Sequence, residues 1–246
     1  MGDAKLDAYS DAVISAAIRP SAQQDIRHAL ALIARGRWAA FAQPLQLLAL
    51  RRYLRMQNRE HKNIHARWTW SPAEAQHYRG EGLARTLLAA AEIVRAKFNR
   101  DNPGYRLALS PLRTLERQVS LWNGNLYVRT AAIQLSKYIL TELSANQFGM
   151  PPDADDMESF VPLLQNSTVN PEPTSAAPGT SDHGQLRAVD FVVYQGNALV
   201  AGTNSSSIVP VWKAQGWEQK LMAATKNTGL IGPLQHPYEP WHWRLA

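Results

Sequence analysis

Apolar residues recur at helical spacing through the first part of the chain. In residues 21–36, Ser21 is a candidate N-cap, apolar positions follow at intervals of three or four, and Gly36 ends the pattern. The same spacing predicts a helix over residues 44–57. A Ser-Pro-Ala-Glu capping box then begins a predicted helix over residues 71–98.

Shorter patterns follow the Asn-Pro-Gly break at residues 102–104. The alternation of residues 106–110 predicts a strand. The elements predicted after it are two helices, a β-hairpin, a helix that turns at Gly216 and a final strand, over residues 114–124, 127–143, 188–202, 207–224 and 240–245.

Residues 151–178 interrupt this order. They hold six of the fifteen prolines and an acidic run, which predicts a surface loop or a partly ordered excursion. The order of the other elements indicates an α+β fold, with a small antiparallel sheet flanked by helices. We divide the chain into a basic helical section, residues 1–70, and a second domain, residues 71–246, with 151–178 as an insertion.

The excess of positive charge is confined to the first 70 residues, which hold eleven Lys and Arg against five Asp and Glu. The basic stretch at 51–67 favours contact with nucleic acid, a membrane surface or an anionic wall polymer; a solvated helix face is the alternative. Because no recognition motif accompanies the charge, nucleic acid is not an expected partner.

Composition narrows the possible classes further. No apolar run approaches the roughly 18–20 residues of a membrane span, and Asp3, Asp7 and Asp11 interrupt any signal peptide, so neither a transmembrane segment nor Sec export is expected. The chain has no cysteine. A transition-metal site must therefore use His, Asp or Glu.

Ionisable residues gather in the stretches 109–118, 178–191 and 236–243. In the second stretch, His183 and Asp190 are seven residues apart and would face opposite ways on one straight strand. They can meet only if the chain turns between them, which Gly184 permits.

The third stretch ends in Glu-Pro-Trp-His-Trp, and Arg244 follows it. Strand alternation places Trp241 and Trp243 on one face, where they anchor the chain end, and His242 on the other. Two histidines and an aspartate form a three-ligand set for catalytic zinc, with the fourth position left for water. Glu239 lies near enough in sequence to take up a proton there.

These motifs together resemble the zinc D-Ala-D-Ala carboxypeptidases and dipeptidases, a family that includes vancomycin-resistance peptidases and several phage endolysins. The family pattern is S-x-H-x6-D, then E-P-W-H, with an upstream arginine in S-x-x-R-S/T. Here Ser-Pro-Leu-Arg-Thr at 110–114 supplies the arginine. The resemblance spans residues 105–243, and nothing in residues 1–70 takes part.

The resemblance implies a role for each matched residue. The implied zinc ligands are His183, Asp190 and His242. Glu239 is the implied general base and acid, and Arg113 the residue that polarises the scissile carbonyl or holds the substrate carboxylate. Ser181 and Trp241 are further candidates for substrate binding.

The implied function is a zinc metallopeptidase that hydrolyses peptidoglycan stem peptides, with D-Ala-D-Ala carboxypeptidase activity as the leading expectation. The alternatives are an endopeptidase that cleaves L-Ala-D-Glu bonds or cross-links, as an endolysin or secreted antibacterial effector, and a non-catalytic wall-binding module. Its site of action is expected to be the periplasm or cell wall, reached by phage lysis or specialised secretion, with the cytoplasm as the alternative.

The chain departs from the family pattern in three places. Leu186 stands where the family has glycine, so the loop after His183 is expected to run differently. The motif at 110–114 lacks the aromatic residue of the commoner Ser-Gly-Tyr-Arg-Ser. The connection from 124 to 178 is long and is expected to add a lid or wall to the cleft.

Overall fold

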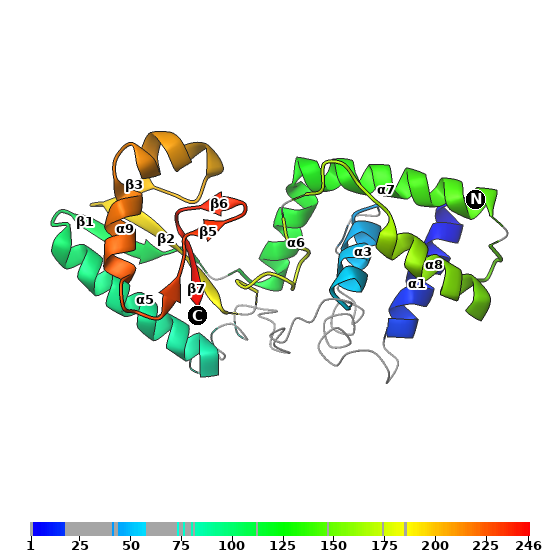
Figure 1. Cartoon of the computed structure of the whole chain (residues 1–246), viewed down its shortest axis with the longest axis horizontal. Helices are drawn as coiled ribbons and strands as arrows, with labels where there is room; N and C mark the ends of the chain where they lie inside the picture. The colour runs from blue at the N-terminus through cyan, green and yellow to red at the C-terminus, as the bar shows by residue number, and fades with distance from the viewer. Residues whose placement is uncertain are drawn as a thin grey trace. The chain divides into compact units, whose positions relative to one another are not determined.

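The computed structural model describes residues 2–17, 41, 44–57, 73, 76, 80, 82–111, 113–146, 148–173, 175–184 and 186–246. They form two compact units (Figure 1). The helical unit lies within residues 1–68 and 115–181, and the sheet unit within 69–114 and 182–246. Residues 115–181 thus group with the N-terminal helices, whereas the sequence division placed them in the second domain.

The described part of the helical unit consists of α1 (Gly2–Ala17), α3 (Leu45–Gln57), α6 (Leu115–Gly124), α7 (Leu126–Ala145) and α8 (Ala154–Asn166). The predictions for α3, α6 and α7 are confirmed to within two residues. Helix α7 begins at Asn125, whose side chain accepts a hydrogen bond from the Val128 backbone. Its buried stripe includes Leu135 and Ile139, and the helix packs against α1 and α3. The helix predicted over 21–36 lies outside the described residues.

Helix α8 corrects the prediction of a loop over residues 151–178. Asp153 is the N-cap, and its side chain and that of Asp156 each accept a hydrogen bond from the other's backbone N–H, which forms a capping box. Acidic residues in a first turn also interact favourably with the helix dipole. The acidic run that argued against a strand therefore begins a helix, which accommodates Pro162 in its interior.

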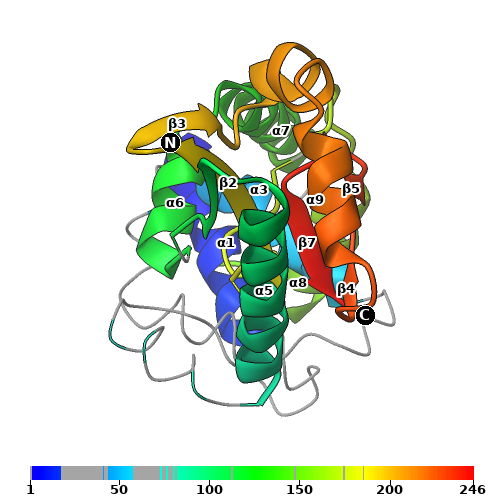
Figure 2. The same cartoon turned by 90° about the vertical axis from the view of Figure 1, so that its left-hand side faces the viewer.

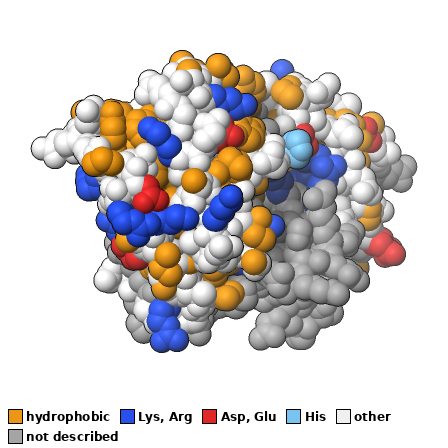
Figure 3. All heavy atoms as spheres, turned by 60° about the vertical axis from the view of Figure 1, so that its left-hand side comes forward, with side chains coloured by type: hydrophobic (Ala, Val, Ile, Leu, Met, Phe, Trp, Pro, Cys, Tyr) orange, Lys and Arg blue, Asp and Glu red, His pale blue; other side chains and the backbone are white. Residues whose placement is uncertain are grey.

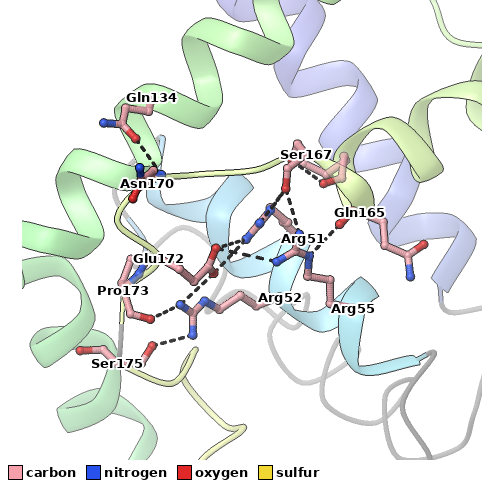
Figure 4. Close-up of polar contacts among 11 residues, drawn as sticks. Arg51, Arg52, Arg55, Gln134, Gln165, Ser167, Asn170, Glu172, Pro173 and Ser175 are labelled. Carbon is pink, nitrogen blue, oxygen red and sulfur yellow. Dashed lines mark hydrogen bonds and ion pairs between the residues drawn. The ribbon is translucent and has the colours of Figure 1, made fainter. Parts of the chain in front are cut away.

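The basic residues of α3 face the protein rather than solvent (Figure 4). Arg51, Arg52 and Arg55 donate hydrogen bonds to backbone carbonyls within residues 165–175, and all three lie within 4 Å of the Glu172 carboxylate. We call these four residues the arginine clamp. The Arg51 side chain is 0% exposed, so a solvated face does not describe this part of α3. The predicted contact with an anionic polymer or membrane surface stays a prediction.

The sheet unit begins with α5 (Gly82–Asp101) and ends with the last strand of the sheet. The elements between are β1 (Tyr105–Leu109), β2 (Ala188–Gln195), β3 (Ala198–Ala201), η3 (Ser205–Ser207), η4 (Ile208–Lys213), α9 (Trp217–Thr225), β4 (Leu230–Ile231), β5 (Leu234–Gln235) and β6 (Tyr238–Glu239), followed by β7 (His242–Leu245). The predicted strand at 106–110, the hairpin, the turn at Gly216 and the final strand are all present.

Strand β2 organises the antiparallel sheet, whose order is β1-β2-β7-β4 with β3 also paired to β2. Strand β1 pairs with residues 191–195 of β2, and β7 with residues 188–190. Strands β5 and β6 form a separate two-stranded ladder. This mixture of helices and antiparallel strands agrees with the predicted α+β class.

Helices α5 and α9 cover one face of the sheet (Figure 2). The core on that face contains Phe98, Phe191 and Trp217, together with the alternate residues Trp243 and Leu245. Because side chains alternate along a strand, Asp190 and His242 belong to the opposite face of β2 and β7. The hydrophobic core therefore fixes the strands that present these two residues.

The surface of the molecule carries mixed side chains. Figure 3 shows Lys and Arg side chains lying among exposed hydrophobic ones on the face in view. Exposed apolar residues such as Ile93 and Leu199 are ordinary on proteins and define no binding site by themselves. Within the described residues, no helix is both long enough and apolar enough to cross a membrane.

Candidate metal centre

Two strands and one turn of the sheet unit bring the predicted metal ligands together. His183 lies in the turn before β2, Asp190 is in β2, and His242 begins β7. In the antiparallel ladder Asp190 lies directly opposite His242. Residues directly opposite each other project from the same face of a sheet. The β2–β7 pairing therefore joins two ligand candidates that are 52 residues apart in sequence.

The turn between His183 and β2 is closed by backbone hydrogen bonds from Leu186 to His183 and from Arg187 to Asp182. Leu186 has a φ of 51°, in the left-handed region. Most residues other than glycine adopt this region at a cost of roughly 1–2 kcal/mol. Position 186 thus has a conformation that suits glycine, although a buried leucine occupies it, and the expectation that the loop runs differently from that of the resembled family stays a prediction.

The three candidate ligand atoms form a small triangle. His183 Nε2 lies 2.9 Å from His242 Nδ1 and 3.1 Å from Asp190 Oδ1, and the third side, from His242 Nδ1 to Asp190 Oδ1, is 3.2 Å. The two imidazole rings are nearly perpendicular, with an interplanar angle of 86°. All three residues are buried.

This triangle fits a metal ion better than it fits hydrogen bonding alone. A shared proton joins two of three converging atoms, whereas a cation contacts all three. A tetrahedral ion with bonds of about 2.0–2.1 Å separates its ligands by about 3.3 Å, close to the observed 2.9–3.2 Å. The buried group of His183, Asp190 and His242 can therefore hold a metal ion.

The electrostatics of the group favour metal-binding protonation states. Burial lowers the pKa of His183, which favours the neutral imidazole that coordinates metals. Burial of Asp190 opposes its ionisation, but hydrogen bonds from His183 and His242 and the charge of Arg113 hold its pKa well below the usual range. The carboxylate is thus ionised and the His183 ring neutral near pH 7, as a metal requires of its ligands.

Arg113 supports the group through Asp190. Its guanidinium donates to Asp190 Oδ2 at 2.5 Å, while Asp190 Oδ1 faces the two histidines. Partners of this kind orient a metal ligand and commonly change metal affinity 10- to 100-fold. The sequence singled out Arg113 but did not indicate this contact. Its predicted roles on a substrate carbonyl or carboxylate stay predictions.

Glu239 lies at the edge of the group, in β6. Its Oε2 is 3.8 Å from His242 Nδ1, and its side chain is 29% exposed. Burial and the negative charge of Asp190 raise the pKa of Glu239. A partly exposed carboxyl group with a raised pKa is suited to accepting and returning a proton. The structure thus brings Glu239 and Arg113 together with the three ligand candidates.

The two tryptophans that flank His242 are core residues, as the sequence predicted. Trp241 packs with its ring centroid 6.0 Å from that of Trp212, and Trp243 donates to the Pro240 carbonyl. Because Trp241 is only 2% exposed, it belongs to the core, and its contribution to substrate binding stays a prediction.

Gly232 is a positioning residue that the sequence analysis missed. A Cβ atom there would lie 2.6 Å from the Trp243 ring and 2.8 Å from the His242 carbonyl oxygen. The chain can therefore approach the strand that carries His242 only because residue 232 has no side chain. The signal in the sequence was a glycine directly before a proline, which is also common in ordinary turns.

Ser181, the remaining candidate for substrate binding, belongs to the helical unit. Its hydroxyl donates to the Gln118 side-chain oxygen at 3.4 Å, and the same oxygen accepts a hydrogen bond from the Gly179 backbone. The contribution of Ser181 to substrate binding stays a prediction, as does the lid expected from residues 124–178.

Fold and site together define an α+β protein whose sheet carries a buried group able to hold a metal ion. No protein-family model, curated protein or solved structure matches the chain. Support for a function therefore comes from the geometry of this group and from the motifs of the sequence.

Proposed function

We propose that the sheet unit is a zinc-dependent peptidase that acts on peptidoglycan stem peptides and removes a terminal D-alanine. The observation that carries the proposal is the triangle of His183, Asp190 and His242 with Glu239 at 3.8 Å from His242. Two histidines and one carboxylate are a ligand set of catalytic zinc sites. The substrate class is supported by the resemblance of the motifs to the D-Ala-D-Ala peptidases.

Each residue has a role that its surroundings suit. Bound zinc supplies Lewis-acid polarisation of a peptide carbonyl and makes a water molecule more acidic. Glu239 accepts a proton from the attacking water and returns it to the leaving nitrogen, a task for which its raised pKa is favourable. Arg113 orients Asp190 through Asp190 Oδ2, and its charge adds to the hydrogen bonds from His183 and His242 that lower the pKa of Asp190.

The test separates metal binding from turnover. Full-length wild type and Glu239→Gln are loaded with zinc, their metal content is measured, and both are incubated with muropeptides ending in D-Ala-D-Ala. We expect about one zinc per chain in both proteins and a loss of turnover of about 100- to 10,000-fold in the variant. Equal turnover by both proteins refutes the role of Glu239, and wild type that holds zinc yet cleaves no stem peptide refutes the proposed activity.

A matched control is available in the same unit. Glu218 lies on α9, where its carboxylate accepts a hydrogen bond from Tyr238, and Glu218→Gln removes the same charge without touching a ligand candidate. We expect zinc content and turnover in this variant to stay within a few-fold of wild type. A loss as large as that of Glu239→Gln would attribute the effect to general electrostatics.

A further inference from the structure

The face of the sheet that carries the metal group also carries a second arginine. Asp190 lies opposite His242, and the next pair on the same face is Ala188 opposite Arg244. On its other side Arg244 pairs with Ile231 of β4. Because positions two apart on a strand share a face, Arg244 projects from the same face as His242, about 6–7 Å along the strand.

Arg244 differs from Arg113 in what it contacts. Arg113 is tied to the Asp190 carboxylate at 2.5 Å. Arg244 is exposed and, within the residues that the structure describes, forms no ion pair. Ala188, which lies opposite Arg244, and Asp190 are two positions apart on β2 and therefore share that face. Of the two arginines, Arg244 is therefore the one whose guanidinium remains available to a ligand.

The spacing suits a peptide with one residue beyond the bond to be cleaved. One extended residue spans about 3.3–3.6 Å. The side chain of Arg244 is long enough to cover the remaining distance between the peptide C-terminus and the Cα atom of residue 244. A guanidinium binds a carboxylate through two parallel hydrogen bonds. This inference rests on the proposed function: we infer that Arg244 selects peptides that end in a free α-carboxylate next to the cleaved bond.

The exposed side chain of Ile231 supports the assignment. It is 49% exposed and lies beside Arg244 on the same face through the β4–β7 pairing. An apolar surface next to a cation suits a small residue such as alanine, with its methyl group on Ile231 and its carboxylate on Arg244. An amidated C-terminus loses the ion pair with Arg244, and a side chain larger than a methyl group fits the Ile231 surface less closely.

The experiment compares N-acetyl-D-Ala-D-Ala with its C-terminal amide. Dissociation constants are measured by calorimetry on the zinc-loaded full chain with Glu239→Gln, with and without Arg244→Gln, and kcat and KM are measured in the active background. We expect the acid to bind about 10- to 100-fold more tightly than the amide. Arg244→Gln should remove that preference by raising the dissociation constant and KM of the acid, with kcat nearly unchanged and the amide unaffected.

Arg106→Gln is the matched control, because it removes the same charge from an exposed arginine that stacks on Tyr194 at the far end of β2. It should keep the preference for the acid. If Arg244→Gln also keeps it, the role of Arg244 is refuted while the peptidase proposal stands. If wild type treats acid and amide alike, the carboxylate inference fails and an endopeptidase is favoured. If neither peptide binds or is cleaved, both proposals fail.

Discussion

Each unit of the protein buries a charged group. The two groups differ in whether protein atoms supply hydrogen-bond partners for the buried atoms. In the helical unit, Arg51 is fully buried, yet its donors end on the Ser167 carbonyl and on both oxygens of Glu172. In the sheet unit, two imidazole nitrogens and one carboxylate oxygen converge within 3.2 Å. In the first group, the Arg51 guanidinium has protein acceptors for its hydrogen bonds. The second gathers three atoms of the kind that bind a cation.

This difference separates a structural role from a functional one. A buried ion pair whose hydrogen bonds are met internally holds segments together, and the arginine clamp joins α3 to residues 165–175. A buried cluster of three atoms of the kinds that coordinate metals can hold a cation. The sequence indicated the ligand candidates of the second group by their motifs, but it did not indicate that the arginines of α3 bind Glu172.

The largest expected effect is on metal binding in the sheet unit. Since zinc binding to a full site contributes about 10–16 kcal/mol, removal of one ligand by His242→Ala should weaken zinc on the order of 100- to 1000-fold. Competition with a chelator of known affinity measures this. His236→Ala, outside the group, is the control and should bind zinc as wild type does. An unchanged zinc affinity in His242→Ala would show that the ligand set is wrong.

A substitution in the arginine clamp is expected to lower the stability of the helical unit. Arg51→Met removes the buried partner of Glu172 and of the Ser167 carbonyl, which keep Arg52 and Arg55 as partners. Because the Glu172 side chain is itself 42% exposed, the variant should lower the free energy of unfolding of the helical unit by about 1–3 kcal/mol. Urea denaturation followed by circular dichroism checks the value. Zinc affinity should not change. A variant of wild-type stability would mean that the clamp does not hold the segment.

Arg113 lies between these cases because its side chain is 34% exposed while its partner, the candidate ligand Asp190, is buried. Arg113→Gln should weaken zinc binding about 10- to 100-fold by removing the donor to Asp190 Oδ2. The same competition assay measures it, with Arg95→Gln as a control on the surface of α5. A full loss of binding would instead assign Arg113 to the integrity of the fold.

The smallest effect is expected at Arg55, the most exposed arginine of the arginine clamp. Arg55 is 34% exposed and lies 3.8 Å from Glu172, so solvent screens the pair, and Arg55→Gln should cost less than about 1 kcal/mol. Urea denaturation followed by circular dichroism, as for Arg51→Met, measures this change in the free energy of unfolding. A cost equal to that of Arg51→Met would show that burial does not govern the clamp.

Local patterns predicted the elements of this protein better than they predicted the contacts between them. The alternation of Trp241, His242 and Trp243 and the helical spacing of residues 44–57 depend on near neighbours, and the structure agrees with both. Asp190 was correctly expected to reach the side of His183 only after a turn. That the left-handed residue of this turn is Leu186 was not expected.

Contacts between distant segments could not be predicted from the sequence. Arg113 meets Asp190 across 77 positions and Arg51 meets Glu172 across 121, and a single sequence records neither pairing. The acidic stretch at 153–156 was predicted to lie in a loop, and the capping box formed by Asp153 and Asp156 shows that a helix begins there.

The central claim is that His183, Asp190 and His242 bind one metal ion, and a metal titration tests it most directly. The full chain is stripped with a chelator, titrated with zinc, and compared with Asp190→Ala, whose folding is checked by circular dichroism. The account predicts one tightly bound zinc per wild-type chain and none at the same concentrations in folded Asp190→Ala. A wild-type chain that binds no zinc, or a folded Asp190→Ala variant that binds it equally well, contradicts the account.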